Sequence, residues 1–137
     1  MAVQFALIRM ETKQFAMFPE KILSNQFNVG TEFQFAVSED KSNIRCLGSF
    51  TYTDQEHMVL FCEVGCHFAI KPESWEEMKT EDGSFAIPKG FLQHIATILV
   101  GATRGVLFCK TEGTILQNYV LPLLDLTQII TDGMSVK

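Results

Sequence analysis

The sequence predicts an α+β fold in which a four-stranded antiparallel sheet is followed by a long helix and a short C-terminal helix. Apolar and polar residues alternate through most of the first half of the chain, and short polar clusters separate the alternating stretches. A long apolar stretch with helical spacing follows. The 137 residues fit one compact domain, residues 1–137, because no repeat or low-complexity linker divides them.

The first predicted strand ends near Pro19, and its apolar residues change parity along the way. Phe5 and Leu7 occupy odd positions. Ile8 and Met10, further along, occupy even positions. We therefore expect either a β-bulge in this strand or apolar cover on both of its faces.

Three further strands are predicted at 26–38, 44–53 and 58–70, where apolar residues recur at every second position. Polar clusters at 38–43 and 53–56 separate them and are typical of tight turns. Short turns join antiparallel neighbours, so we expect an antiparallel sheet with one face more completely covered than the other.

We expect this face of the sheet to be covered by a helix that begins at Pro88 and ends before Gly113. Its residues are apolar around most of the circumference, so we expect the sheet on one side and a second subunit on the other. Residues 72–82 are predicted to be a solvated turn of helix or loop, and 121–130 a short amphipathic helix.

Charge and composition exclude several classes of protein. The net charge of -5 provides no electrostatic footprint for nucleic acid. Twelve of the fifteen aromatic residues are Phe, which favours apolar contact over recognition of a small polar ligand. Arg9, Glu11 and Lys13 interrupt any signal-peptide core, and no apolar run is expected to reach the length of a membrane span. We expect a cytoplasmic protein that does not insert into membranes.

The sequence predicts neither an enzyme nor a metal or cofactor site. It contains no nucleophile elbow, phosphate loop, dinucleotide fingerprint or zinc-hydrolase helix. The sulfur atoms of Cys62 and Cys66, beside His67, would lie roughly 13 Å apart along a strand, too far for one ion. The cysteines are interpreted as small apolar residues.

Two glycines spaced four residues apart on the long helix, Gly101 and Gly105, permit a close helix crossing. The helix either packs tightly on its own sheet or crosses a partner helix. Its apolar circumference favours the second alternative, which places Gly101, Gly105, Leu99 and Val106 in an oligomer interface of a dimer or tetramer.

Several short segments, taken in order, resemble the SecB family of export chaperones. They are Phe5-Ala-Leu-Ile-Arg9, Thr12-Lys13, Phe18-Pro19, Leu60-Phe-Cys-Glu-Val64, Phe68-Ala-Ile70, the helix from Pro88 to Arg104-Gly105, and Leu121-Pro-Leu-Leu-Asp125. Residues 103–114 look closer to SecB-like relatives, including those that accompany toxin–antitoxin systems, than to the export chaperone itself.

The resemblance implies four strands, two helices and a dimer of dimers whose members hold unfolded chains in apolar grooves without ATP or metal. Leu60, Cys62 and Val64 match groove positions of the family. Phe33 and Phe35, on the apolar side of the strand at 26–38, complete the candidate polypeptide-binding groove.

The resemblance also implies a partner-docking face on the other side of the sheet, where Phe61 and Glu63 match the surface on which export chaperones bind SecA. Two acidic positions of the family are Gln14 and Phe18 here, and the second helix is shorter. We therefore expect docking to SecA to be weak or absent.

Three functions remain open from the sequence. The first is a SecB-like, ATP-independent holdase for non-native polypeptides, with a link to protein export left open. The second is a dedicated adaptor or antitoxin-type chaperone for one partner. The third, an apolar small-ligand binder or enzyme, is disfavoured by a Phe-rich cavity without convergent polar groups.

Overall fold

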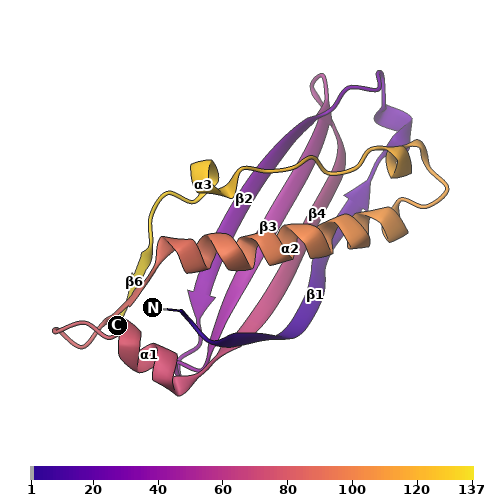
Figure 1. The fold of residues 1–137 in the computed structure, drawn as a ribbon. Coiled ribbons are helices and arrows are strands. Elements are labelled where there is room, and N and C mark those ends of the chain that lie inside the picture. The colour runs from indigo at the N-terminus through magenta and orange to yellow at the C-terminus, as the bar shows by residue number, and fades with distance from the viewer. Residues whose placement is uncertain (1) are drawn as a thin grey trace.

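Four long antiparallel strands form one sheet in the order β1-β4-β3-β2 (Figure 1). The computed structural model describes residues 2–137. The strands are β1 (Phe5–Met17), β2 (Asn28–Val37), β3 (Asn43–Asp54) and β4 (His57–Ile70). A long helix and a short C-terminal helix follow, so the predicted α+β class and element order are confirmed.

The parity change in β1 is caused by a β-bulge. Its register against β4 shifts between Leu7 and Arg9, and shifts again between Thr12 and Gln14. Leu7, Ile8 and Met10 remain exposed, so the alternative of apolar cover on both faces is wrong.

The helix α2 (Lys89–Lys110) crosses one face of the sheet and encloses the core between itself, β3 and β4 (Figure 1). It begins directly after Pro88, and Gly113 adopts a left-handed φ of 82° in the turn that follows it. Gly48 of β3 permits the close approach of the helix, because a Cβ atom there would lie 2.5 Å from Cδ2 of Leu99.

Smaller elements close the two ends of the fold. They are η1 (Pro19–Lys21), α1 (Pro72–Met78), β5 (Phe85–Ile87), η2 (Ile115–Asn118), α3 (Leu126–Ile129) and β6 (Met134–Val136). The pairing of β5 with β6 was not predicted. The expectation that 72–82 is solvated is wrong in part, because Trp75 and Met78 of α1 are buried.

Helix α2 also corrects the expectation that no apolar run reaches the length of a membrane span. By length and composition alone, Lys89–Lys110 is long and apolar enough to cross a membrane. Core helices of globular proteins pass the same test, and one side of α2 is buried against the sheet, with Leu92, Ile95 and Leu99 almost inaccessible.

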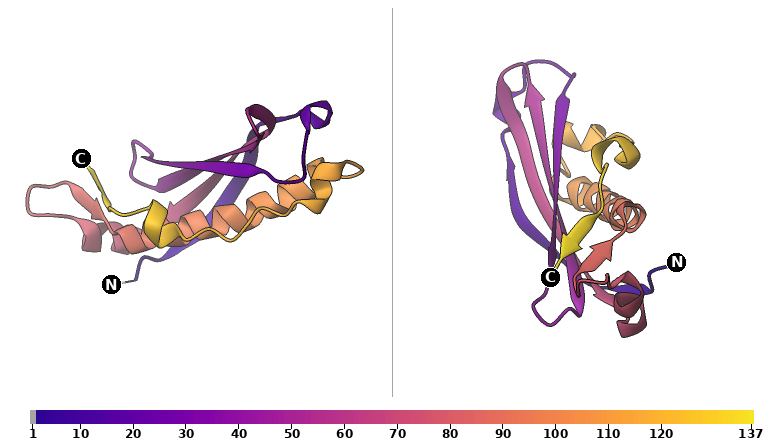
Figure 2. Two further views of the ribbon diagram at one scale, coloured as in Figure 1. Left: turned by 90° about the horizontal axis from the view of Figure 1, so that it is seen from above. Right: turned by 90° about the vertical axis from the view of Figure 1, so that its left-hand side faces the viewer.

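The two faces of the sheet differ in their cover. Helix α2 and the segment of residues 115–132, hereafter the C-terminal segment, lie on the same side of the sheet (Figure 2). The opposite side, hereafter the far face, is crossed by no helix or strand among residues 2–137 (Figure 2). The far face carries the odd-numbered residues of β3 and, from Phe61 onward, of β4, and apart from Gly65 these are half-buried.

Candidate functional site

Two depressions lie between the C-terminal segment and β2 with the residues that lead into it, and we call them together the aromatic groove. The first has a volume of about 400 Å³, with Phe33 and Phe35 on one side and Ile129 and Ile130 on the other. Thr31, Glu32, Thr131 and Asp132 complete its lining. The second has a volume of about 240 Å³ and is lined by Asn25, Phe27, Ile115, Asn118 and Tyr119.

Contacts between aromatic rings hold the walls of the groove. Tyr119 meets Phe27 and Tyr52 edge to face, with ring centroids 5.0 and 5.1 Å apart. Phe33 packs edge to face on Phe50 of the core, with centroids 6.0 Å apart. The groove is therefore continuous with the core, which fixes its aromatic side chains in place.

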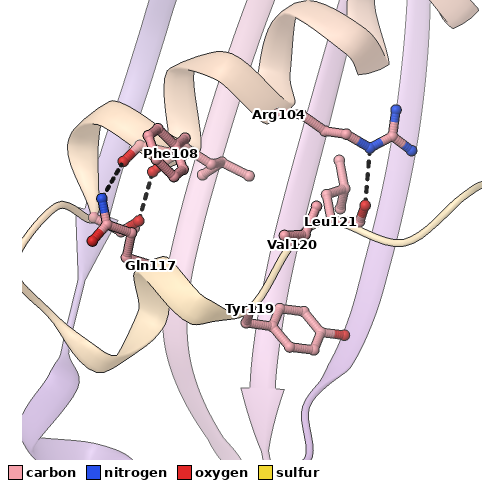
Figure 3. Close-up of a pocket in the computed structure, with 8 residues that line it drawn as sticks. Arg104, Phe108, Gln117, Tyr119, Val120 and Leu121 are labelled. Atoms are coloured by element: carbon pink, nitrogen blue, oxygen red, sulfur yellow. Dashed lines mark hydrogen bonds between the residues drawn. The ribbon is translucent and has the colours of Figure 1, made fainter.

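Side chains of α2 hold the C-terminal segment in position. Arg104 donates a hydrogen bond from Nε to the carbonyl of Leu121 (Figure 3) and another from Nη2 to that of Pro122, each 2.9 Å long. Gln93 donates from Nε2 to the carbonyl of Ile130 at 2.8 Å. These donors satisfy backbone carbonyls of a segment that is mostly irregular and cannot pair them internally.

Asp54 at the end of β3 anchors the loop that leads into β2. Its Oδ2 accepts hydrogen bonds from the backbone amides of Leu23 and Ser24 at 2.6 and 2.7 Å, and its Oδ1 accepts one from the Ser24 hydroxyl at 2.9 Å. The hydrogen bonds from the backbone amides of Ser24 and Leu23 hold the pKa of Asp54 below its usual value. Burial of the carboxylate acts in the opposite direction and offsets this lowering only in part.

Three residues predicted to line the groove lie elsewhere. Leu60, Cys62 and Val64 of β4 are 0% exposed and belong to the core beneath α2. Their predicted place on an open groove is therefore wrong in this structure, because α2 occupies the face onto which they project. Phe33 and Phe35 do line the groove, since β2 lies at the edge of the sheet.

The predicted docking residues Phe61 and Glu63 lie half-buried on the far face. Glu63 accepts a hydrogen bond from the Ser49 hydroxyl at 2.8 Å and pairs in register with Gln14 of β1. An uncharged side chain thus lies beside Glu63 at one of the two positions where the sequence departs from the family pattern.

The predicted oligomer interface is divided by the structure. Gly101 and Gly105 lie on the exposed side of α2 with open space around them, and Val106 is half-buried. Leu99 is 0% exposed and packs toward the sheet, so its assignment to a surface interface is wrong. Phe108 and Leu123 are exposed apolar residues that the sequence analysis had not singled out.

No group of three or more metal-ligating side chains gathers anywhere in residues 2–137. Cys46 and Cys66 pair in register within the core, and Cys62 lies nearby on β4. Burial raises the pKa of the Cys46 thiol to about 12 and that of Cys62 to about 11. Such thiols stay protonated at neutral pH and are poor nucleophiles.

Sequence reasoning had not identified Phe27, Tyr119 and Ile129 as groove residues. The last two belong to the C-terminal segment, where no sustained period indicates which side chains turn toward β2. The cluster of Phe residues on the apolar side of β2 was the one feature of the sequence that could have indicated the groove.

Comparisons with known proteins identify no family for this chain. No family model matches, and no curated protein matches. A crystal structure of a protein of unknown function from Streptococcus agalactiae is similar, with 12% sequence identity and a TM-score of 0.42. That similarity covers 91% of this chain and 100% of the other.

Proposed function

We propose that this protein is an ATP-independent holdase that binds non-native polypeptide segments in the aromatic groove, as its resemblance to SecB-like chaperones implies. The observation that carries the proposal is the groove itself. Its two depressions place Phe27, Phe33, Phe35 and Tyr119 beside aliphatic side chains of the C-terminal segment. Burial of apolar surface there contributes about 25 cal/mol per Å² to binding, without sequence specificity.

The free edge of the sheet adds a second means of binding extended chains. β2 is an edge strand that pairs with β3 without a register shift, and its range contains neither Lys, Arg nor Pro. Glu32 is its one charged residue, and edge strands with so few protecting features readily accept another strand. An extended client segment in the groove would therefore meet unpaired backbone groups of β2 as well as its Phe side chains.

Docking to SecA is not part of this proposal. Glu63 lies beside Gln14 on the far face, and Phe18 follows β1 where the family has a second acid. Exposed charge pairs each contribute up to about 1 kcal/mol, so the loss of two acids weakens a docking site that depends on several.

The test is the aggregation of a heat-unfolded substrate in the presence of the protein without nucleotide. We expect delayed aggregation at near-stoichiometric amounts. Ile129→Asp should weaken the effect, because Ile129 lines the groove and is 41% exposed, and a bound apolar segment would have to desolvate the new carboxylate.

The matched control is Ile8→Asp, which makes the same change at a residue that is 55% exposed on β1, at the opposite edge of the sheet. This variant should protect the substrate as the unmodified protein does. A requirement for ATP, no delay at excess protein, or equal losses in the two variants would overturn the proposal.

A further inference from the structure

Three basic side chains form a row across the far face, on the side of the sheet opposite the aromatic groove. His67 of β4 pairs in register with Arg45 of β3 on one side and with Arg9 of β1 on the other. Neighbouring strands are about 4.8 Å apart, so the two arginines lie roughly 10 Å apart with His67 between them. We call these three residues the basic row.

Arg45 lacks a partner for its charge. Its side chain makes no hydrogen bond or ion pair with any other part of residues 2–137, and its Nε is buried without an acceptor. A buried donor without an acceptor is unfavourable, because it has lost its water and gained nothing in exchange. The guanidinium therefore has unused capacity to bind an oxyanion in a planar, two-pronged geometry.

A depression with a volume of about 250 Å³ adjoins Arg45. It is lined by Ala36, Val37, Ser38, Asn43, Arg45 and His67. The side chain of Asn43, which precedes Arg45 by two residues on β3 and lies on the same face, brings a further N–H donor to it. The depression thus combines a cation, a neutral donor and an imidazole within one shallow site.

Two carboxylates close to the row or its depression are already engaged. Glu11 contacts Nη2 of Arg9 at 3.2 Å and Nε2 of His67 at 2.9 Å. The Asp40 carboxylate, in the turn beside the depression, accepts hydrogen bonds from the hydroxyls of Ser38 and Ser42 at 2.8 and 2.6 Å. Neither carboxylate contacts Arg45.

We propose that the basic row is a docking site for an acidic, extended polypeptide segment, with one of its carboxylates bound by Arg45 in the depression. Charge complementarity favours an acidic partner at this place although the whole chain carries a net charge of -5. Alternate residues of an extended segment lie about 7 Å apart on one face, so such a segment can present one carboxylate to Arg45 and a second toward Arg9, which a single small ion cannot do.

The test is the binding of a fluorescently labelled peptide of alternating Asp and Ser to the full chain at low salt, followed by anisotropy. Arg45→Gln should weaken binding by about tenfold, the loss expected for charge-assisted hydrogen bonds. Glu11→Gln should strengthen it, because Arg9 and His67 are then released from their carboxylate partner.

Lys89→Gln is the matched control. Lys89 is exposed at the start of α2, on the other side of the sheet, and its substitution removes one positive charge as Arg45→Gln does. It should change the affinity by less than about twofold. Circular dichroism checks that each variant remains folded, and Arg45→Lys, which keeps the charge and loses the planar donors, should give an intermediate affinity.

Four outcomes would overturn the proposal. The first is no preference for the acidic peptide over one of alternating Lys and Ser, the second an equal loss of affinity from Arg45→Gln and Lys89→Gln, and the third no gain of affinity from Glu11→Gln. The fourth is displacement of the peptide by acetate or phosphate at concentrations similar to its own. The last result would identify a small-anion site instead. Because the groove and the basic row lie on opposite faces of the sheet, failure here would leave the aggregation assay unaffected.

Discussion

The carboxylate of Asp54 helps to position β2 beside the groove, because it anchors the loop that leads into this strand. The three hydrogen bonds that it accepts come from Leu23 and Ser24. Replacement by Asn keeps the shape of the side chain, but its NH2 group would then point at an N–H or O–H donor of the loop instead of accepting a hydrogen bond from it. The loop and the adjoining Phe27 would then lose their anchor.

We predict that Asp54→Asn destabilises the protein at neutral pH, and that the difference from the unmodified protein shrinks in acid. The pKa of Asp54 is lowered by folding, so the ionised carboxylate stabilises the folded state above the unfolded pKa of about 4. That stabilisation is lost as the pH falls through the lower, folded pKa. Urea unfolding measured from pH 7 down to pH 3 would show it, and a difference that does not change with pH would contradict it.

At the scale of elements, Arg104 makes two of the hydrogen bonds by which α2 holds the C-terminal segment. We predict that Arg104→Met, which keeps the aliphatic stem and removes the donors, destabilises the protein by about 1–3 kcal/mol. The carbonyls of Leu121 and Pro122 lose their partners in this variant. Urea unfolding gives the magnitude, and limited proteolysis should show faster cleavage within 115–125.

Lys110→Met is the control for that experiment, because Lys110 lies on the same helix and its side chain makes no hydrogen bond with residues 2–137. It does lie 5.5 Å from the ring of Phe15, an interaction worth less than about 1 kcal/mol at an exposed site. Equal cleavage of the two variants would show that Arg104 does not hold the segment.

The same elements show how far sequence patterns reach. Strands β2, β3 and β4 were predicted within about two residues, because in each strand one face is more covered than the other and apolar residues alternate with polar ones over most of its length. The alternation does not reveal what covers that face. Leu60, Cys62 and Val64 consequently read equally well as groove or core, and only the path of α2 decides for the core. β5 and β6 span three residues each, too few to show a period.

At the scale of the whole molecule, large apolar side chains are exposed near the end of α2 and on the C-terminal segment, although the rest of the exposed side of α2 carries polar residues and glycines. Phe108, Val120 and Leu123 are exposed there, and Leu123 is 91% exposed. We predict that the protein associates with itself through these residues as a dimer or tetramer, because large apolar side chains that are exposed in the monomer favour association. Light scattering at micromolar concentration measures it, and a monomer would contradict it.

Substitutions at Gly101 distinguish an effect on self-association from an effect on helix stability. Nothing lies within 4 Å of a Cβ atom built there, so Gly101→Ala should stabilise an isolated chain by up to about 1 kcal/mol through helix propensity. Where two helices cross at this glycine, Gly101→Leu would instead shift the association toward monomer. Unchanged assembly in the Leu variant would remove Gly101 from the interface.

The pairing of β1 with β4 has a consequence for biosynthesis. β1 leaves the ribosome before β2, β3 and β4, yet the strand to which it hydrogen-bonds is the last of the four to be made. Until then its residues Phe5, Phe15 and Met17, which pack against the core in the folded protein, have no partner strand, and long-range pairing of this kind is slow. The nascent chain of a protein proposed to shield others is thus itself in need of shielding, and its yield in cells should depend on the chaperones that meet chains at the ribosome.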